Sequence, residues 1–299
     1  MIKVNNIVKS FDDYTAVDGI SLCVENSSIY GLVGYNGAGK TTLLKVIAGV
    51  YFQDSGTVEL DGIDINEHPE QKAEMFYVPD DLYFRLSATM NSTAKYYSKY
   101  YPDFSFEAFK KLTALFGLDP KKRISGFSKG MQRQAEIVLG LSCRPKVLLL
   151  DESFDGLDPA KRNFVKKLLL DYMAEKECSV IISSHNLHEL ADMCDHIALI
   201  NGQKIAMNCA VDDMNGSRCK FRLAFADDIS QEAFSGIEYK NYSADGRIIT
   251  FTVSKNLDEA EKIISSLNPI FVERFPLSLE EIFLEEMEDT DYDFEQIFS

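Results

Sequence analysis

Short apolar runs alternate with amphipathic stretches along the first two hundred residues. The runs "SIYGLV", "PKVLLLDES" and "CSVIISSH" are mostly apolar, which is typical of parallel strands that are covered on both faces. The stretches "GKTTLLKVIAGV" and "KRNFVKKLLLDYMAEK" repeat their apolar positions at helical spacing. This alternation of strands and helices predicts an α/β fold.

Three further patterns refine the picture of this first domain, which we expect to cover residues 1–210. The N-terminal "IKVNNIVKSF" predicts a strand, and "GTVELDGIDI" predicts two strands joined by a turn at Asp61-Gly62. Residues 88–122 are helical in period and rich in aromatic side chains. They predict a helical subdomain over about residues 86–145.

The pattern changes near residue 210 and predicts a second, smaller domain over residues 217–288. Its expected elements are strand 219–226, helix 229–235, strands 237–242 and 247–253, helix 257–267, strand 270–275 and helix 279–287. This β-α-β-β-α-β order is typical of a ferredoxin-like α+β domain. The last fifteen residues hold seven acidic side chains and no basic one, so we expect residues 289–299 to form a solvated acidic tail.

Composition narrows the classes of protein that fit this pattern. The chain has 299 residues, 45% hydrophobic and 26% charged, as in ordinary soluble proteins of two domains. Its net charge of −16 argues against nucleic acid as a partner. No two of the six cysteines have CxxC spacing, which argues against a zinc ribbon and indicates a reducing compartment. The polar N-terminus and the lack of a long apolar run predict a cytoplasmic protein.

The stretch "VGYNGAGKTT" is the first candidate for chemistry. Its glycines, with Lys40 and Thr41 after them, fit the phosphate-binding pattern GxxxxGK[ST], although an ordinary glycine turn is the alternative. A strand before it and a helix after it favour the phosphate loop, because backbone N–H groups and the helix N-terminus then face one anion. Lys40 would reach the β- and γ-phosphates, and Thr41 would hold Mg²⁺. The expected binding residues are Gly34, Tyr35, Asn36, Gly37, Ala38, Gly39, Lys40, Thr41 and Thr42.

A second candidate stands at the end of the apolar strand "VLLLDE". Asp151 would bind Mg²⁺ through water, and Glu152 would orient or deprotonate the attacking water. An apolar strand that ends in Asp-Glu is often only a surface boundary. With the phosphate loop upstream, it becomes the second half of a nucleotide site.

The segment between these two motifs indicates the type of nucleotide site. In "GFSKGMQRQAEIVLGL", Ser128 precedes a predicted helix, and it could be simply an N-cap. It lies 23 residues before Asp151, and "SFDGLDP" directly follows Glu152. With these motifs in this order, residues 1 to about 210 resemble the ATP-binding cassette (ABC) family. The resemblance implies a P-loop NTPase fold of ABC type with a helical subdomain.

The resemblance also implies roles for further residues. In that family two cassettes pack head to tail around two ATP molecules, so that each ATP meets the phosphate loop of one subunit and the signature motif of the other. Here Asp158 resembles the D-loop residue that reaches the opposite subunit. His185 resembles the switch residue that contacts the γ-phosphate. Phe11, or Tyr14 in its place, resembles the aromatic that stacks on adenine, with core packing as the alternative. The signature residues are Ser128, Lys129, Gly130 and Met131.

Three departures from the family pattern bear on these roles. Asp80 stands where the family usually has glutamine, which puts its metal-sensing role in doubt. Lys129 and Met131 replace the usual glycine and glutamine of the signature, and Ser153 replaces a common proline. None of these changes removes Lys40, Asp151, Glu152 or His185, so we expect active ATP hydrolysis with Mg²⁺.

The chain resembles a separate nucleotide-binding subunit, of the kind found in bacterial drug and peptide exporters. It would dimerise with a second ABC subunit and drive an integral membrane subunit from the inner face of the membrane. The alternative is a non-transport ABC ATPase of translation or DNA repair, and the single cassette, the acidic charge and the absence of heptads argue against it. Glu152 and His185 argue against a silent binding module.

Overall fold

The computed structural model describes residues 1–187, 190, 192–213, 218–277 and 281–282. It divides into two compact units, Met1–Asn208 and Cys209–Ser299. The expected helix at 279–287 and the acidic tail at 289–299 lie largely or wholly outside the described residues. Among the residues that are described, no helix is long and apolar enough to cross a membrane.

The first unit is built on a six-stranded sheet in the order β10-β9-β3-β8-β7-β6. Strand β3 pairs in parallel with β8 and β9, and β7 pairs in parallel with β6 and β8. Every residue of β3, β7 and β8 is buried, as the apolar runs predict. The carboxyl ends of these strands meet at one edge of the sheet, where α/β folds bind ligands. The strands are β3 (Ile29–Val33), β6 (Met75–Val78), β7 (Val147–Asp151), β8 (Ser179–Ser184), β9 (His196–Asn201) and β10 (Lys204–Ala210).

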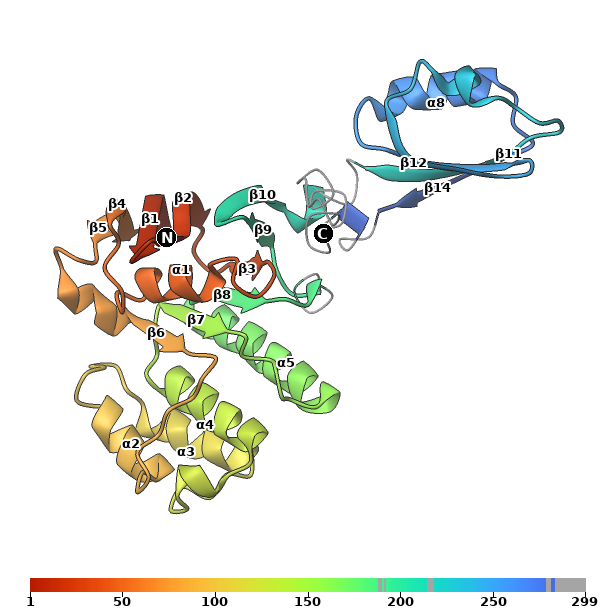
Figure 1. Cartoon of the computed structure of the whole chain (residues 1–299). Coiled ribbons are helices and arrows are strands. Elements are labelled where there is room, and N and C mark those ends of the chain that lie inside the picture. Colours follow the sequence, from red (N-terminus) through yellow and green to blue (C-terminus); the bar gives the residue numbers. More distant parts are fainter. Residues whose placement is uncertain (188–189, 191, 214–217, 278–280, 283–299) are drawn as a thin grey trace, which may run out of the picture. The chain divides into compact units, whose positions relative to one another are not determined.

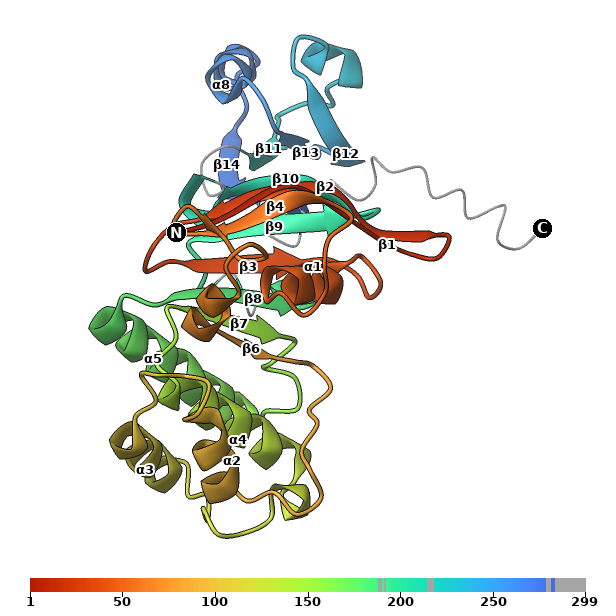
Figure 2. The same ribbon diagram turned by 90° about the vertical axis from the view of Figure 1, so that its left-hand side faces the viewer.

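A second, antiparallel sheet with the order β2-β1-β4-β5 covers the first helix. Helix α1 (Lys40–Ile47) lies between the two sheets, and α5 (Pro159–Lys176) lies on the far side of the six-stranded sheet (Figures 1 and 2). Leu43, Leu44 and Ile47 of α1 are buried in the core shared by both sheets. The strands are β1 (Ile2–Phe11), β2 (Tyr14–Val24), β4 (Ser55–Leu60) and β5 (Ile63–Asp64).

The turn predicted at Asp61-Gly62 is confirmed. It joins β4 to β5, which pair antiparallel. Both turn residues have positive φ, 52° and 79°, which is the geometry of a two-residue type I′ hairpin turn.

The predicted helical region is present but is not continuous. It forms α2 (Met90–Tyr97), α3 (Phe106–Leu115) and α4 (Lys129–Ser142), with short 3₁₀ turns at Pro69–Glu74 and Ile124–Gly126. Pro102 lies between α2 and α3, where it cannot continue a helix. Side chains of Thr89, Ser105 and Ser128 cap the three helices. The helices enclose their own apolar core around Met90, Phe109 and Leu139.

A buried carboxyl group lies inside this helical region. Glu136 of α4 is 6% exposed, and the Tyr97 hydroxyl donates to its Oε1 at 3.2 Å. Among the residues that the structure describes, none hydrogen-bonds to its Oε2. Burial raises the pKa of Glu136 from 4.5 to about 7, against the opposing effects of Tyr97 and Arg133.

This burial predicts a stability that falls with rising pH. The native state keeps the Glu136 proton to higher pH than the unfolded chain, so stability is lost between pH 4.5 and about 7. Glu136→Gln should remove the loss of folding stability that comes from this carboxyl group. The variant should therefore be more stable than the wild type at pH 8 by on the order of 2 kcal/mol. Urea unfolding at pH 5 and pH 8 measures it. Glu107→Gln, at an exposed carboxylate of α3, is the control, and an equal gain from both variants would contradict the prediction.

The second unit is a four-stranded antiparallel sheet with the order β12-β13-β11-β14. Its first and third strands are central, as in a ferredoxin-like domain, and Phe221, Phe234 and Phe251 lie in its core. The helix predicted at 229–235 is wrong in type, since only a 3₁₀ turn (Gln231–Phe234) forms before Gly236. The other elements are β11 (Cys219–Ala224), β12 (Tyr239–Asp245), β13 (Ile248–Val253), α8 (Leu257–Ser266) and β14 (Phe271–Pro276).

Candidate functional site

The loop between β3 and α1 requires glycine at defined positions. A Cβ at Gly39, whose φ is 105°, would lie 2.3 Å from the carbonyl oxygen of Ala16. A Cβ at Gly34 would lie 2.6 Å from the carbonyl oxygen of Ile200. Helix α1 has no side-chain cap. Its first N–H groups and its positive dipole end are therefore available to an anion such as phosphate.

Lys40, the first residue of α1, is held inside this loop. Its side chain is 4% exposed, and Nζ donates to the carbonyl oxygens of Gly34 at 2.6 Å and Tyr35 at 3.2 Å. Nζ also lies 3.2 Å from Oε1 of Glu152. The lysine is therefore oriented by the backbone that would surround a phosphate chain.

Asp151 at the end of β7 is fully buried and is held by three hydroxyl groups. Thr41 and Ser183 donate to its Oδ1 at 3.1 and 2.6 Å, and Tyr77 donates to its Oδ2 at 2.9 Å. Tyr77 and Ser183 have no motif of their own that assigns them this role. Ser183 is the first residue of "SSH", and Tyr77 lies on β6, three residues before Asp80. Parallel register places Ser183 opposite Asp151, and it places Tyr77 opposite Leu149, two residues before Asp151.

Removing the Tyr77 hydroxyl should weaken the hold on Asp151. Tyr77→Phe keeps the ring but deletes one hydrogen bond to a buried carboxylate, which is worth about 1.5–3 kcal/mol. We expect a higher Mg²⁺ concentration for half-maximal hydrolysis and weaker binding of Mn²⁺ with ATP, measured by electron paramagnetic resonance. Tyr97→Phe removes a similar bond within the helical region and is the matched control. Equal metal affinity in both variants would contradict a positioning role for Tyr77.

Glu152 links the two other groups that the sequence singled out. It lies between Lys40 and His185: His185 Nδ1 is 3.0 Å from Oε2, and the His185 backbone N–H donates to the same oxygen at 3.3 Å. Glu152 has a left-handed φ of 45°, and its N–H donates to the Ser183 hydroxyl at 3.0 Å. A buried carboxylate with oriented neighbours is suited to accept a proton from water.

The oxygen atoms beside Lys40 fit a magnesium ion. Thr41 Oγ1 and Asp151 Oδ1 lie 3.1 Å apart at the start of α1, and Mg²⁺ prefers carboxylate, hydroxyl and phosphate oxygens. When bound, the ion would neutralise charge on the phosphates. Thr41 and Asp151 are the residues that would hold it.

The structure pairs Asp80 with an arginine. Arg133 of α4 is buried and donates through Nη2 to the Asp80 carbonyl oxygen at 2.7 Å and to Oδ1 at 3.3 Å, and through Nη1 to the carbonyl oxygen of Pro79. Burial raises the pKa of Asp80, while Arg133 opposes this rise. A metal role for Asp80 stays a prediction. No motif in the sequence marks Arg133 for this contact.

The signature and D-loop residues begin helices. Ser128 caps α4 by accepting from the Met131 N–H at 3.3 Å, and Asp158 caps α5 by accepting from the Lys161 N–H at 2.9 Å. Ser128 and Lys129 are exposed, whereas Met131 packs against the helical core. A Cβ on Gly130 would lie 3.1 Å from the carbonyl oxygen of Gly156. Ser128 and Asp158 therefore do cap their helices, and both side chains remain exposed.

The two aromatic candidates for adenine lie at the β1–β2 turn. Phe11 and Tyr14 pair across the strands and are both exposed. The Tyr14 hydroxyl donates to the carbonyl oxygen of Gly37 at 3.1 Å, while Phe11 packs edge-on against Tyr51 at 5.3 Å between ring centroids. Tyr14 is thus the one of the two that is hydrogen-bonded to the phosphate loop.

Comparison with known proteins decides the family. A family model described as "ABC transporter" matches residues 17–155. The ABC transporter ATP-binding protein YtrB of Bacillus subtilis is 30% identical over 284 residues, which is 95% of this chain and 97% of YtrB. This chain is an ABC transporter ATP-binding protein. It is also 32% identical to the linearmycin resistance ATP-binding protein LnrL of Bacillus subtilis, over 71% of this chain and 70% of LnrL.

Solved structures agree with the fold. An "ATP binding subunit of ABC transporter" aligns with a TM-score of 0.67 and 22% identity, over 72% of this chain and 92% of that chain. As a member of the ABC ATPases, the protein binds ATP, hydrolyses it to power transport, and works with a membrane transporter subunit. Relatives named for lipopolysaccharide export and for methionine import also match. The names therefore do not give the direction of transport.

Proposed function

We propose that this ABC ATPase dimerises head to tail around two Mg²⁺–ATP complexes and drives an exporter. The contacts of Glu152 with Lys40 and His185 carry the hydrolytic part of this proposal, because they place a base beside a phosphate loop. Within the described part of the chain, no hydrogen bond joins the exposed Ser128 to that loop. Ser128 and Lys129 are instead free to face the ATP of a second subunit.

The exporter direction is supported by a relative named for linearmycin resistance, LnrL. The small unit that follows the cassette also resembles the arrangement in the drug- and peptide-exporter subgroup. Peripheral attachment to the inner face of the membrane, through the membrane subunit, belongs to the same proposal.

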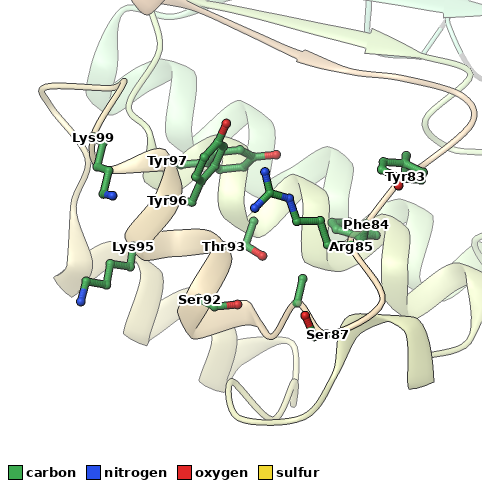
Figure 3. Close-up of a pocket in the computed structure, with 11 residues that line it drawn as sticks. Tyr83, Phe84, Arg85, Ser87, Ser92, Thr93, Lys95, Tyr96, Tyr97 and Lys99 are labelled. Carbon is green, nitrogen blue, oxygen red and sulfur yellow. The ribbon is translucent and has the colours of Figure 1, made fainter.

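A pocket in the helical region is a suitable surface for the membrane subunit. It measures about 510 Å³ and is lined by eleven residues between 83 and 99, among them Arg85, Lys95 and Lys99 (Figure 3). Arg85 lies over the Tyr96 ring at 5.5 Å. Tyr83 and Leu86 are 88% and 84% exposed. Apolar and basic groups together suit an amphipathic segment that carries acidic residues.

Transport into vesicles tests the direction. A tagged protein is purified with its membrane subunit and placed in liposomes with the ATPase facing outward. If the protein drives export, added Mg²⁺–ATP should move a labelled amphipathic peptide into the lumen, and Lys40→Ala should abolish this movement. Loss of peptide from preloaded vesicles would indicate import and contradict the proposal.

A further inference from the structure

The second unit has two edge strands with different character. At one edge, β12 is irregular between Lys240 and Ser243 and ends in Asp245. Bulges and charges of this kind protect an edge from pairing with another chain. At the other edge, β14 pairs with β11 in unbroken register from Phe271 to Pro276. Its outer side has no neighbouring strand within the described sheet.

Large apolar side chains are exposed along this second edge. The exposed fractions are 71% for Ile270, 49% for Phe271, 48% for Val272 and 40% for Phe275. In contrast, Phe221 and Leu223 on the neighbouring β11 are buried. Successive residues of a strand point to opposite faces, so Phe271 and Val272 expose apolar surface on both faces of the sheet. A regular, apolar, unprotected edge is a ready template for another strand.

We infer that β14 pairs antiparallel with β14 of a second copy of this chain, which joins the two sheets into one of eight strands. A twofold axis perpendicular to the sheet makes two identical edge strands run antiparallel, with equivalent faces on the same side. Residues directly opposite each other then have numbers that differ by an even amount. One residue therefore lies directly opposite its own copy, and the twofold axis passes midway between these two copies.

The register centred on Glu273 satisfies the side chains best. It places Phe271 opposite the partner's Phe275 and does so twice, which forms cross-strand aromatic pairs. Each Glu273 lies opposite Arg222 on its own β11, so the two central carboxylates each have a cation beside them. A register centred on Arg274 would place Glu273 against Phe275, and one centred on Val272 would place Phe271 against Glu273.

A second copy is the expected occupant because ABC ATP-binding subunits dimerise. The inference rests on the proposed function in this respect, since the ATP-bound dimer would supply the second β14 at high effective concentration. A short strand pair is weak alone, but it would strengthen a dimer that is held by ATP. The pairing is isologous and therefore closes at two subunits.

Disulfide trapping in the full-length chain tests the inference directly. Opposed residues of an antiparallel pair have Cβ atoms about 4.5–5.5 Å apart, close to disulfide reach. In a background where exposed Cys23 is serine, Glu273→Cys should give a covalent dimer and no larger species under mild oxidation. Ser243→Cys, an exposed position on the opposite edge strand β12, is the matched control. Equal cross-linking of both variants, or none at Glu273→Cys, would overturn the inference.

Sedimentation gives a second measurement that does not need a disulfide. In the presence of Mg²⁺–ATP and the Glu152→Gln change, Phe275→Lys should raise the dimer dissociation constant at least about tenfold. Ile248→Lys, on a central strand of the same sheet, should leave it unchanged. Equal dissociation constants for the two variants would count against β14.

The outcomes separate this inference from the proposed ATP dimer. A Glu273→Cys cross-link without any ATP-dependent dimer would support strand pairing and reject the sandwich. An ATP-dependent dimer without the cross-link would support the ATP sandwich and reject the strand pairing. If the cross-link forms only after residues 283–299 are deleted, the chain's own C-terminal segment occupies the edge, and the inference fails.

Discussion

Replacing Glu152 by glutamine should lower ATP turnover at least about 100-fold while ATP binding persists. The amide has nearly the same shape, so it can still accept hydrogen bonds from Lys40 and from the His185 N–H, which contact Glu152 in the structure. It cannot accept a proton from water. ATP that binds without being hydrolysed should hold two subunits together, and the variant should accumulate as a dimer.

Two measurements on one preparation check this result. Phosphate release gives turnover, and light scattering with and without Mg²⁺–ATP gives the mass. Asp155→Asn is a useful control, because Asp155 lies 4.0 Å from His185 but does not contact Lys40 in any described bond. Wild-type turnover in Glu152→Gln would remove Glu152 from the role of base.

Replacing Ser128 by alanine should lower hydrolysis about 100-fold if its hydroxyl contacts the ATP of the other subunit. The lost helix cap alone would cost only about 1 kcal/mol of stability and would leave turnover per folded molecule intact. ATP affinity of the monomer should hardly change.

In Lys40→Ala, by contrast, ATP affinity itself should fall about 10- to 100-fold, because the charge that faces the phosphates is gone.

Mixing the two variants sharpens this test. A subunit without Lys40 and one without Ser128 together contain one complete composite site and one doubly defective site. Hydrolysis in the mixture above that of either variant alone supports the head-to-tail dimer. An active Ser128→Ala monomer would show instead that one chain contains the whole site.

The parts of the site that can be predicted from the sequence are those formed by residues close together in the chain. The phosphate loop is local: its glycines, Lys40 and Thr41 are spaced by the strand–loop–helix geometry itself. Glu152 and His185 each follow a buried strand, and parallel pairing brings the ends of β7 and β8 together. Ser153, at the position of a common proline, donates to the Asp151 carbonyl oxygen at 3.3 Å.

The parts that the sequence does not show depend on register or on weak local signals. Tyr77 reaches Asp151 because β6 pairs with β7 in the register that places Val78 opposite Leu150. The hydrophobic pattern of the two strands does not show which residues lie opposite each other. Arg133 is one of several polar residues at the start of α4, and its target is a distant loop. In the second unit, "SQEAFSG" has too few residues before Gly236 to propagate a full α-helix.

Arg133 has a mechanical consequence for the whole cassette. Its guanidinium holds the backbone of Pro79 and Asp80 from within α4, and Ser128 caps the N-terminus of the same helix. Because a buried, multiply bonded guanidinium resists separation from its acceptors, the segment after β6 and the first turn of α4 should move as one rigid body. A force applied at Tyr83 or Leu86 would then displace Ser128. Binding of a partner at that surface would in this way move the signature residues.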